Sequence, residues 1–174
     1  MPPVGEHRKL AENVVVRFCI LVTSDAVYQG RRRDEVTPAA ATAVTDAGHI
    51  LVNAAVAPND PSKIESMVKE SISVCDAVLV TGGTGIGPKD VTVDAVRKLC
   101  SKELPGFGEL FRYLTYLKHG AAAMASRAFA CVAGDSIVFV TPGSKDAVEL
   151  ALTKLILPEI KHLVYELRGR PAKP

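Results

Sequence analysis

Little net charge remains when the ionisable residues of this chain are balanced against one another. Lysine and arginine number 21, and aspartate and glutamate number 19, which gives a formal net charge of +2. So small an excess gives no electrostatic reason to bind nucleic acid or a membrane surface. Only Arg31-Arg32-Arg33 forms a local basic cluster. We therefore expect neither nucleic acid nor a membrane among the partners of this protein.

Long apolar runs are also missing. No apolar stretch approaches the ~20 residues that a membrane span requires. Residues 1–9 lack the apolar core of a signal peptide. A cytoplasmic protein is the expectation that follows.

Cysteine and histidine are too scattered to predict a metal site. The four cysteines are Cys19, Cys75, Cys100 and Cys131, and none of them is paired at metal-ligand spacing. Three lie in apolar stretches, so we expect buried, inert thiols that stay reduced in a cytosol. None of the four histidines has a neighbour at catalytic or metal-ligand spacing.

Apolar strand-like segments alternate with helical ones along the 174 residues, a length that fits one domain with a sizeable core. Strands are predicted at 14–23, 50–56 and 76–81, and a hairpin at 127–133 and 136–141 turns at Gly134-Asp135. Helices are predicted at 38–47, 63–73, 92–102, 109–118, 145–157 and 159–167, with a break at 104–108 and another at Pro158. This order predicts an α/β fold, a three-layer αβα sandwich with a mostly parallel sheet plus one antiparallel edge strand. Residues 13–168 would form the single domain, between a loose leader at 1–12 and a tail at 169–174.

Polar loops follow the predicted parallel strands, at 24–30, 58–60, 81–90 and 142–144. Ligands of such sheets bind outside the carboxyl ends of the strands. The strands themselves stay apolar, so the four loops predict one composite site.

The loop at 81–94 carries most of the chemical information. Four glycines between Gly82 and Gly87 let backbone N–H groups approach an anion, and a helix is expected to start just after them. Two carboxylates, Asp90 and Asp94, share the segment, which suggests nucleotide chemistry with a bridging Mg²⁺. The spacing fits neither the P-loop, because Pro88 precedes Lys89, nor the dinucleotide fingerprint. A plain tight turn is the alternative.

Several ordered motifs resemble those of the molybdenum cofactor biosynthesis proteins of the MoaB/MogA type. T-G-G-T-G at 81–85 is followed by D-V-T-x-D at 90–94, and Thr23-Ser24-Asp25 resembles the Ser-Asp element of that family. The stretches at 104–112, 125–128 and 142–145 resemble its PGFGE…R, S-R and PG(S/N) elements. The likeness runs from about residue 14 to residue 160.

The resemblance implies a molybdopterin adenylyltransferase, a nucleotidyltransferase that moves AMP from Mg-ATP to the terminal phosphate of molybdopterin and releases pyrophosphate. Magnesium, ATP and molybdopterin are the ligands that it implies. A homo-oligomer, trimer or hexamer, and contact with a downstream metal-insertion protein are implied as well. The alternatives are a molybdopterin-binding protein of the same fold without catalysis, and a hydrolase of nucleotide pyrophosphates.

The same resemblance assigns roles to residues. It implies catalysis by Asp90, with Asp60 or Asn59 as the second group, because Pro58-Asn59-Asp60 stands where relatives have an acidic turn. The residues implied for nucleotide and phosphate binding are Thr81, Gly82, Gly83, Thr84, Gly85, Pro142, Gly143 and Ser144. Those implied for molybdopterin binding are Ser24, Asp25, Thr115, Ser126, Arg127 and Glu109. The implied metal ligands are Asp90, Asp60 and Asp94.

Each acidic assignment has a structural alternative. Asp90 and Asp60 are also suited to capping the helices that follow them, and Asp94 to a solvated first helical turn. Asn59 supplies no charge to a metal, although its carbonyl can coordinate one. The arginines at 31–33 could attract anionic substrates or simply form a solvated loop.

Overall fold

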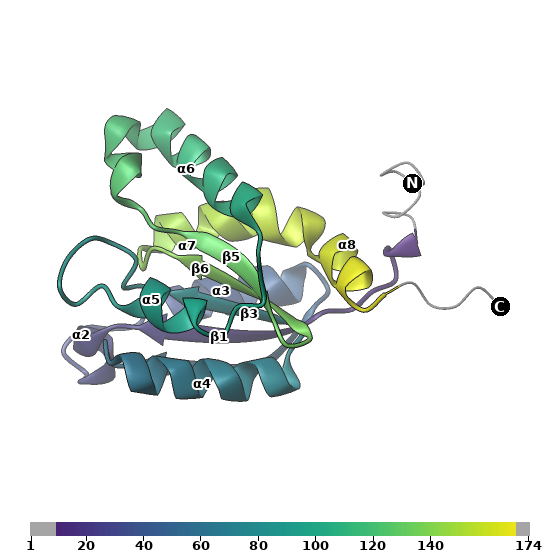
Figure 1. The fold of residues 1–174 in the computed structure, drawn as a ribbon, viewed down its shortest axis with the longest axis horizontal. Helices are drawn as coiled ribbons and strands as arrows, with labels where there is room; N and C mark the ends of the chain where they lie inside the picture. The colour runs from purple at the N-terminus through teal and green to yellow at the C-terminus, as the bar shows by residue number, and fades with distance from the viewer. Residues whose placement is uncertain (1–9, 170–174) are drawn as a thin grey trace.

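A six-stranded sheet with helices on both faces makes up the computed structural model, which describes residues 10–169 (Figure 1). The strands are β1 (Arg17–Thr23), β2 (Ile50–Ala57), β3 (Ala77–Thr81), β4 (Lys102–Glu103), β5 (Phe129–Ala133) and β6 (Ser136–Thr141). The helices are α2 (Asp25–Tyr28), α3 (Val36–Asp46), α4 (Pro61–Val74), α5 (Thr92–Arg97), α6 (Pro105–His119), α7 (Lys145–Ala151) and α8 (Leu157–Leu167). A 3₁₀ segment spans Gly120–Ala125 and a π segment spans Leu152–Ile156.

The strand order is β2-β1-β3-β6-β5-β4, and β2, β1, β3 and β6 are parallel to one another. The hairpin at Gly134 makes β5 antiparallel to β6, and the two-residue β4 pairs antiparallel with β5 at the edge. Strands β3 and β6 are buried along their whole length, as expected of central strands covered on both faces. The predicted α/β sandwich, with its antiparallel addition at one edge, is confirmed.

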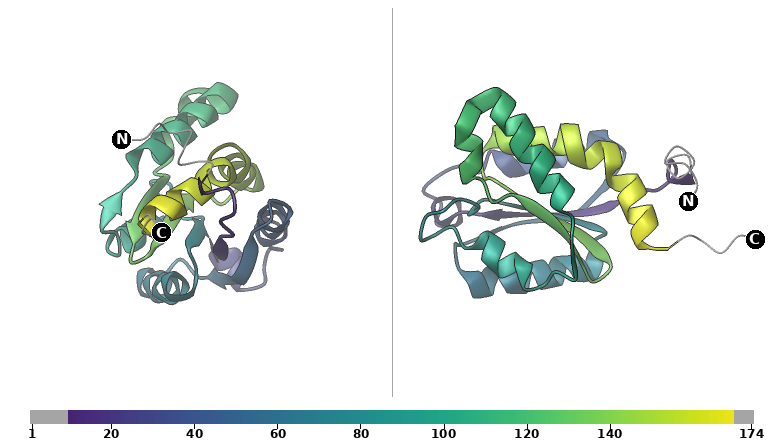
Figure 2. Two further views of the ribbon diagram at one scale, coloured as in Figure 1. Left: turned by 90° about the vertical axis from the view of Figure 1, so that its right-hand side faces the viewer. Right: turned by 45° about the horizontal axis from the view of Figure 1, so that its top comes forward.

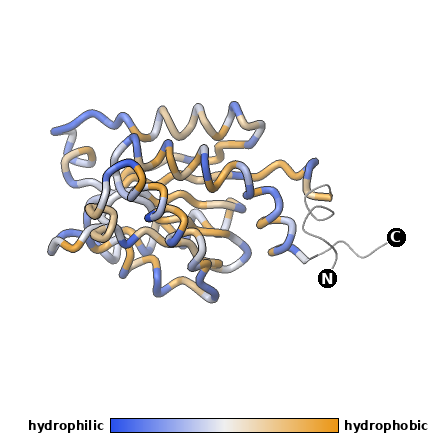
Figure 3. Tube along the Cα trace, turned by 90° about the horizontal axis from the view of Figure 1, so that it is seen from above, coloured by the Kyte–Doolittle hydropathy of each residue, from blue (hydrophilic) through white to orange (hydrophobic). Residues whose placement is uncertain are grey.

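Two apolar cores fill the space between the sheet and its helices. Helices α3, α6, α7 and α8 cover one face, where Phe18, Phe111 and Phe139 are almost fully buried. Helices α4 and α5 cover the other face, through Ile64 and Val96 among others (Figures 1 and 2). Figure 3 shows hydrophobic stretches of the chain in orange, interrupted by hydrophilic stretches in blue. Both faces of the central strands are therefore taken up by packing, which leaves the strand ends to carry polar function.

Helix α6 begins earlier than its sequence suggests. The predicted break at 104–108 is wrong, because Pro105 occupies the first turn of the helix, where its missing N–H costs nothing. Gly108 is needed there, since a Cβ would overlap the carbonyl oxygen of Ala128 and the guanidinium of Arg112. Helix α5 is in turn shorter than predicted, because residues 102–103 pair with β5 as β4.

The predicted break at Pro158 is also displaced. Pro158 lies in the first turn of α8, and the irregular segment is the π turn at Leu152–Ile156 just before it. A proline cannot donate to the carbonyl one turn back, and a widened turn accommodates that loss. The chain therefore continues from α7 to α8 without a loop.

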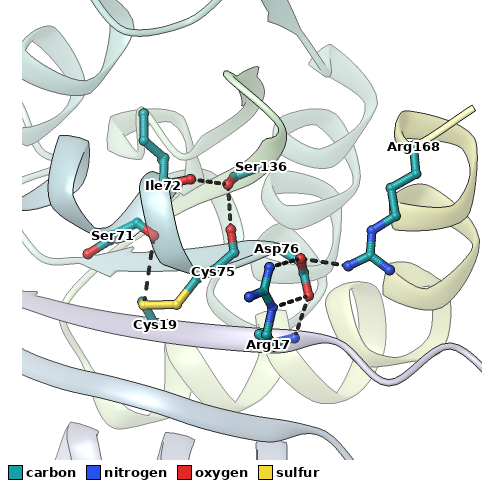
Figure 4. Close-up of polar contacts among 8 residues, drawn as sticks. All are labelled: Arg17, Cys19, Ser71, Ile72, Cys75, Asp76, Ser136 and Arg168. Atoms are coloured by element: carbon teal, nitrogen blue, oxygen red, sulfur yellow. Dashed lines mark hydrogen bonds and ion pairs between the residues drawn. A yellow bond between two sulfur atoms is a disulfide. The ribbon is translucent and has the colours of Figure 1, made fainter.

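A buried carboxylate joins the amino ends of the strands to the last helix (Figure 4). Asp76 accepts hydrogen bonds from the backbone and side chain of Arg17, and the guanidinium of Arg168 lies 2.6 Å from its Oδ1. Burial alone would raise the pKa of Asp76, but the hydrogen bonds from the two arginines outweigh it and the pKa is lowered. Beside it, the hydroxyl of Ser136 donates to the carbonyl oxygens of Ile72 and Cys75.

All four cysteines form disulfides, Cys19 with Cys75 and Cys100 with Cys131. The expectation of reduced thiols is therefore wrong, although Cys19, Cys75 and Cys131 are buried as predicted. Spacing along the chain could not show this, because the fold brings together residues 56 and 31 positions apart, with Cα atoms 5.9 and 5.7 Å from each other. Both bridges attach the α4–α5 layer to the sheet.

The predicted leader lies mostly outside the described residues, as does residue 170 onward of the predicted tail. Within the described part, Ala11 is 1% exposed and thus packs against the domain. No helix in residues 10–169 has the length and apolar character to cross a bilayer.

Candidate functional site

A pocket of about 570 Å³ opens at the carboxyl ends of β1, β3 and β6. The label of α2, the short helix that follows β1, marks this end of the sheet at the left of Figure 1. The predicted site residues that line it come from all four carboxyl-end loops. They are Ser24, Asn59, Gly82, Gly83, Gly143 and Ser144. The four loops therefore meet at one pocket, as their places after the parallel strands predict.

Tight packing fixes the start of the glycine loop between β1 and β6. Gly82 and Gly83 have φ values of 103° and 63°, which favour glycine. A Cβ on Gly82 would overlap the carbonyl oxygen of Thr23, and one on Gly83 would overlap the hydroxyl of Thr92. The Gly82 N–H donates to Thr141 O at 2.9 Å. The two glycines are thus required for backbone to approach backbone at the pocket wall.

Three consecutive N–H groups of this loop remain unused. Within residues 10–169, the N–H groups of Gly83, Thr84 and Gly85 donate no hydrogen bond. Of these residues, Gly83 lines the pocket, while Thr84 is buried, as is Thr81 at the end of β3. Unused N–H groups in a glycine-rich turn are suited to binding an anion, because they can donate hydrogen bonds to it.

Asp90 closes the tip of the glycine loop. Its carboxylate accepts the N–H of Gly87 at 2.8 Å and lies against Gly85, where any Cβ would overlap it. Asp90 is half-buried and is not part of the pocket wall. Its position gives the loop tip a negative charge, and no side-chain cap of α5 is formed.

Arg127 holds the glycine loop from the side of β5. Its Nε donates to Gly85 O at 2.9 Å, and its Nη2 donates to Asp90 O at 2.6 Å. Its Nη1 donates to both carboxylate oxygens of Asp94, at 3.1 and 3.0 Å. The predicted pterin ligand Arg127 and the predicted metal ligand Asp94 are therefore bound to each other in this structure, at the outer side of the loop.

The turn after β2 places the two neighbouring candidate residues, Asn59 and Asp60, in different surroundings. Asn59 lines the pocket, and its Oδ1 is buried with no hydrogen-bond partner among the described residues. Asp60 instead accepts the N–H of Lys63 at 2.8 Å as the cap of α4, with Pro61 in the first turn. Asp25 accepts the backbone N–H of Asn59, and this bond lowers the pKa of Asp25, with Lys89 adding to it from 3.6 Å.

A second, smaller hollow of about 240 Å³ lies beside the first, between α6, the 3₁₀ segment and α7. Thr115, Ser126, Pro142 and Ser144 are among the residues that line it. Ser144 lines both pockets and caps α7 through its hydroxyl. Glu109 is exposed on α6 and lines neither pocket.

Three basic residues outside the predicted set of binding residues also line the larger pocket. They are Arg32 and Arg33, from the loop between α2 and α3, and Lys145, at the start of α7. The basic triplet was visible in the sequence, but only the fold shows that two of its members face the pocket.

The carboxylates of the described residues do not form a complete metal-binding site here. Within residues 10–169, no group of three His, Cys, Asp or Glu side chains is close enough to hold a metal ion. Magnesium commonly binds through one or two protein oxygens together with substrate phosphates. Asn59 lines the pocket, and its Oδ1 is buried without a hydrogen-bond partner among the described residues. One oxygen of that kind is therefore present for a metal that arrives with a phosphate ligand.

Comparison with known proteins places this chain among molybdenum cofactor proteins. The family described as "Probable molybdopterin binding domain" matches residues 19–162. Molybdenum cofactor biosynthesis protein B of Bacillus subtilis is 40% identical over 171 residues, covering 95% of this chain and 97% of the relative. The protein of the same name from Staphylococcus aureus strain MRSA252 is 39% identical over 177 residues, covering 94% and 99%.

Solved structures agree with the sequence relatives. The crystal structure of tungsten cofactor synthesizing protein MoaB from Pyrococcus furiosus matches with a TM-score of 0.83 at 31% identity, covering 89% of this chain and 98% of that one. A crystal structure of molybdenum cofactor biosynthesis protein B has the same TM-score at 38% identity, covering 90% and 98%. The chain therefore belongs to the MoaB/MogA family of molybdenum cofactor biosynthesis proteins.

Proposed function

We propose that this protein works in molybdenum or tungsten cofactor biosynthesis as a molybdopterin adenylyltransferase, which transfers AMP from ATP to the terminal phosphate of molybdopterin. The observation that carries the proposal is the pocket at the carboxyl ends of β1, β3 and β6, where Gly82 and Gly83 form one wall and adjoining N–H groups are unused. A site of this kind stabilises phosphate oxygens by fixed dipoles, which is the main requirement of phosphoryl-type transfer.

The chain's own groups divide the work between them. The N–H groups of Gly83, Thr84 and Gly85 would hold anionic oxygens, and Arg127 keeps the loop in that conformation through Gly85 O and Asp90 O. Magnesium, when bound, neutralises phosphate charge and so relieves repulsion from nearby carboxylates. Asn59, which lines the pocket, and Asp90, outside the pocket wall at the tip of the adjoining glycine loop, are the residues that we propose to hold it.

Two adjoining hollows suit a reaction with two substrates. The larger one contains the glycine loop, and we propose that it takes the nucleotide phosphates. The smaller one contains the hydroxyls of Thr115 and Ser126, and we propose that it takes the pterin, whose edges form hydrogen bonds. Ser144, which lines both, then lies between the two reacting phosphates.

A binding protein without catalysis is the second candidate, and Asn59 is the observation that favours it. An amide in the place of the family's acidic residue removes one negative charge from the metal site. The experiment combines pure protein with molybdopterin, ATP and MgCl₂. Pterin-dependent release of pyrophosphate supports the transferase, and tight pterin binding without turnover supports the binding protein. Turnover of a nucleotide pyrophosphate without pterin would instead indicate a hydrolase.

Asn59→Asp sharpens this experiment. If Asn59 is a weakened metal ligand, the restored carboxylate should leave the rate of pyrophosphate release unchanged or raise it, because Mg²⁺ prefers charged oxygen ligands. A rate that falls tenfold would show that the amide itself is needed.

A homo-oligomer is part of the same proposal. Helix α6 and the 3₁₀ segment after it carry exposed apolar side chains, namely Leu110, Tyr113, Tyr116, Leu117 and Met124. Leu110 also lines an apolar hollow of about 540 Å³ between α6 and α8. Exposed apolar clusters of this kind mark interaction surfaces. Light scattering of the purified protein would give its mass, and Leu117→Glu should lower that mass if α6 forms the contact.

A further inference from the structure

We propose that Arg32 and Arg33 bind a phosphate group of the ligand in the larger pocket, so that this protein holds its anionic substrate in part without metal. The inference deepens the proposed function and rests on it for the identity of the ligand. Arg32 and Arg33 differ from the other described arginines because their side chains have no bonded partner in the described part of the chain.

Every other described arginine has a bonded partner. Arg17 and Arg168 bind Asp76, Arg97 pairs with Glu103, Arg112 donates to Ala128 O, Arg127 binds Asp94, and Arg31 donates to Gln29 Oε1. Arg32 and Arg33 form no hydrogen bond or ion pair through their side chains within residues 10–169. Both nevertheless line the pocket. Two arginines whose side chains have no partner among the described residues therefore line the same pocket as Gly82 and Gly83.

The backbone holds these two arginines beside the pocket. The N–H groups of Arg31 and Arg32 both donate to Ala26 O, at 2.8 and 3.0 Å, and Gly30 turns the chain there with a φ of 71°. The loop is thus folded back on α2, whose cap Ser24 also lines the pocket. A fixed backbone reduces the entropy lost when an arginine binds an anion.

The acidic residues of the pocket wall are fewer than the basic ones. Asp34 lines the pocket, but its carboxylate accepts the N–H groups of Val36 and Thr37 at the start of α3. Glu35 also lines it and is the one acidic side chain of the wall without a bond of this kind within the described residues. Lys145 adds a further positive charge, shared with Glu149 at 3.7 Å. Arg32, Arg33 and Lys145 together outnumber Asp34 and Glu35, so the residues that line the pocket carry one net positive charge.

Phosphate is the chemical group that fits this wall. A guanidinium donates two parallel N–H bonds to a pair of phosphate oxygens, and such charge-assisted bonds are among the stronger polar contacts. The amide of Asn59, which lines the same pocket, carries no negative charge that would repel the anion. The positive wall and the neutral Asn59 thus act in the same direction, toward binding a polyphosphate directly.

The test is calorimetric titration with inorganic pyrophosphate in EDTA, so that no metal takes part. Wild-type protein should bind it, and Arg32→Gln and Arg33→Gln should each raise Kd about tenfold, the loss typical of one charge-assisted contact. Arg31→Gln is the matched control, because Arg31 has the same charge in the same loop but does not line the pocket. It should change Kd by less than about twofold.

Three results of the titration would overturn the proposal: no binding by the wild-type protein, no effect of Arg32→Gln and Arg33→Gln, or an equal effect of Arg31→Gln, which would indicate diffuse attraction. Circular dichroism confirms that each variant is folded. The proposed function is judged separately by pterin-dependent pyrophosphate release with Mg²⁺. Adenylylation that persists unchanged in the Arg32→Gln, Arg33→Gln double variant would sink the arginine proposal and leave the transferase standing.

Discussion

Asp76 and Arg168 form a contact of 2.6 Å that joins the start of β3 to the end of α8 (Figure 4). We expect Asp76→Asn to destabilise the protein by about 2 kcal/mol, because two arginines lose their shared acceptor in a buried place. The melting temperature should fall by about 4–8 °C for a chain of this size. Thermal unfolding followed by circular dichroism measures it.

The same pair gives a dependence on pH. The pKa of Asp76 is lowered in the folded protein, so its contribution is present above its ordinary value of about 4 and is lost as the pH falls through the lowered pKa. The gap in melting temperature between wild type and Asp76→Asn should therefore close below pH 4. A gap that stays constant down to pH 2 would contradict this account.

Reduction of the disulfides should lower stability. The bridges close loops of 56 and 31 residues, and chain entropy assigns each of them about 4 kcal/mol. A strong reductant should thus lower the melting temperature by about 10 °C or more. Alkylation of the unreduced, denatured protein followed by mass spectrometry provides the direct check, and four modified cysteines would show that the bridges are absent.

Arg127→Lys should impair activity more than stability. A lysine cannot donate at once to Gly85 O, Asp90 O and Asp94, so the glycine loop loses its fixed conformation. Pyrophosphate release should fall at least about tenfold. Arg97→Lys is the control, because Arg97 stacks on Phe129 at 5.0 Å, away from the pocket, and its rate should stay within about twofold.

Asp94 should act through Arg127. Asp94→Asn removes the ion pair, and its effect on the rate should not add to that of Arg127→Lys in the double variant, since both disturb the same contact. Fully additive losses would instead give Asp94 a role of its own, such as the metal ligation that the family resemblance implies.

Gly82→Ala should destabilise the protein and disorder the site. Its φ of 103° disfavours any L side chain, and the new methyl group would overlap Thr23 O. A loss of about 2 kcal/mol or more is expected. Gly106→Ala is the matched control in α6, where a Cβ meets nothing within 4 Å and alanine should be neutral or stabilising.

Asp90→Asn tests the catalytic assignment with little change of shape. The amide oxygen can still accept the Gly87 N–H, so the loop should keep its conformation while the negative charge is lost. We expect pyrophosphate release to fall at least about tenfold. An unchanged rate at saturating Mg²⁺ would remove Asp90 from the mechanism.

Patterns along the chain were sufficient for the sheet and for the meeting of its loops. Short apolar runs such as residues 77–81 and 136–141 are typical of central strands, and parallel strands bring their carboxyl ends together. The start of α6 was missed because Pro105 and the glycines after it look like a break. Only the close approach of Ala128 to Gly108 explains why a helix needs glycine there.

What sequence alone could not provide was the direction in which side chains point. Asn59 and Asp60 are neighbours, yet one lines the pocket and the other caps α4. Arg127 matched a pterin-side motif, but its guanidinium binds the loop and Asp94. The disulfides were hidden for the same reason, since a contact between distant residues is a property of the fold.

Ser144 lies at the boundary between the two pockets, because this small residue lines both of them. In the proposed reaction, the adenylyl group would pass from one pocket to the other beside this hydroxyl, without leaving the protein surface. Replacing Ser144 by a residue with a bulky side chain should block this passage. Each pocket would then still bind its ligand, while transfer between the two pockets would stop.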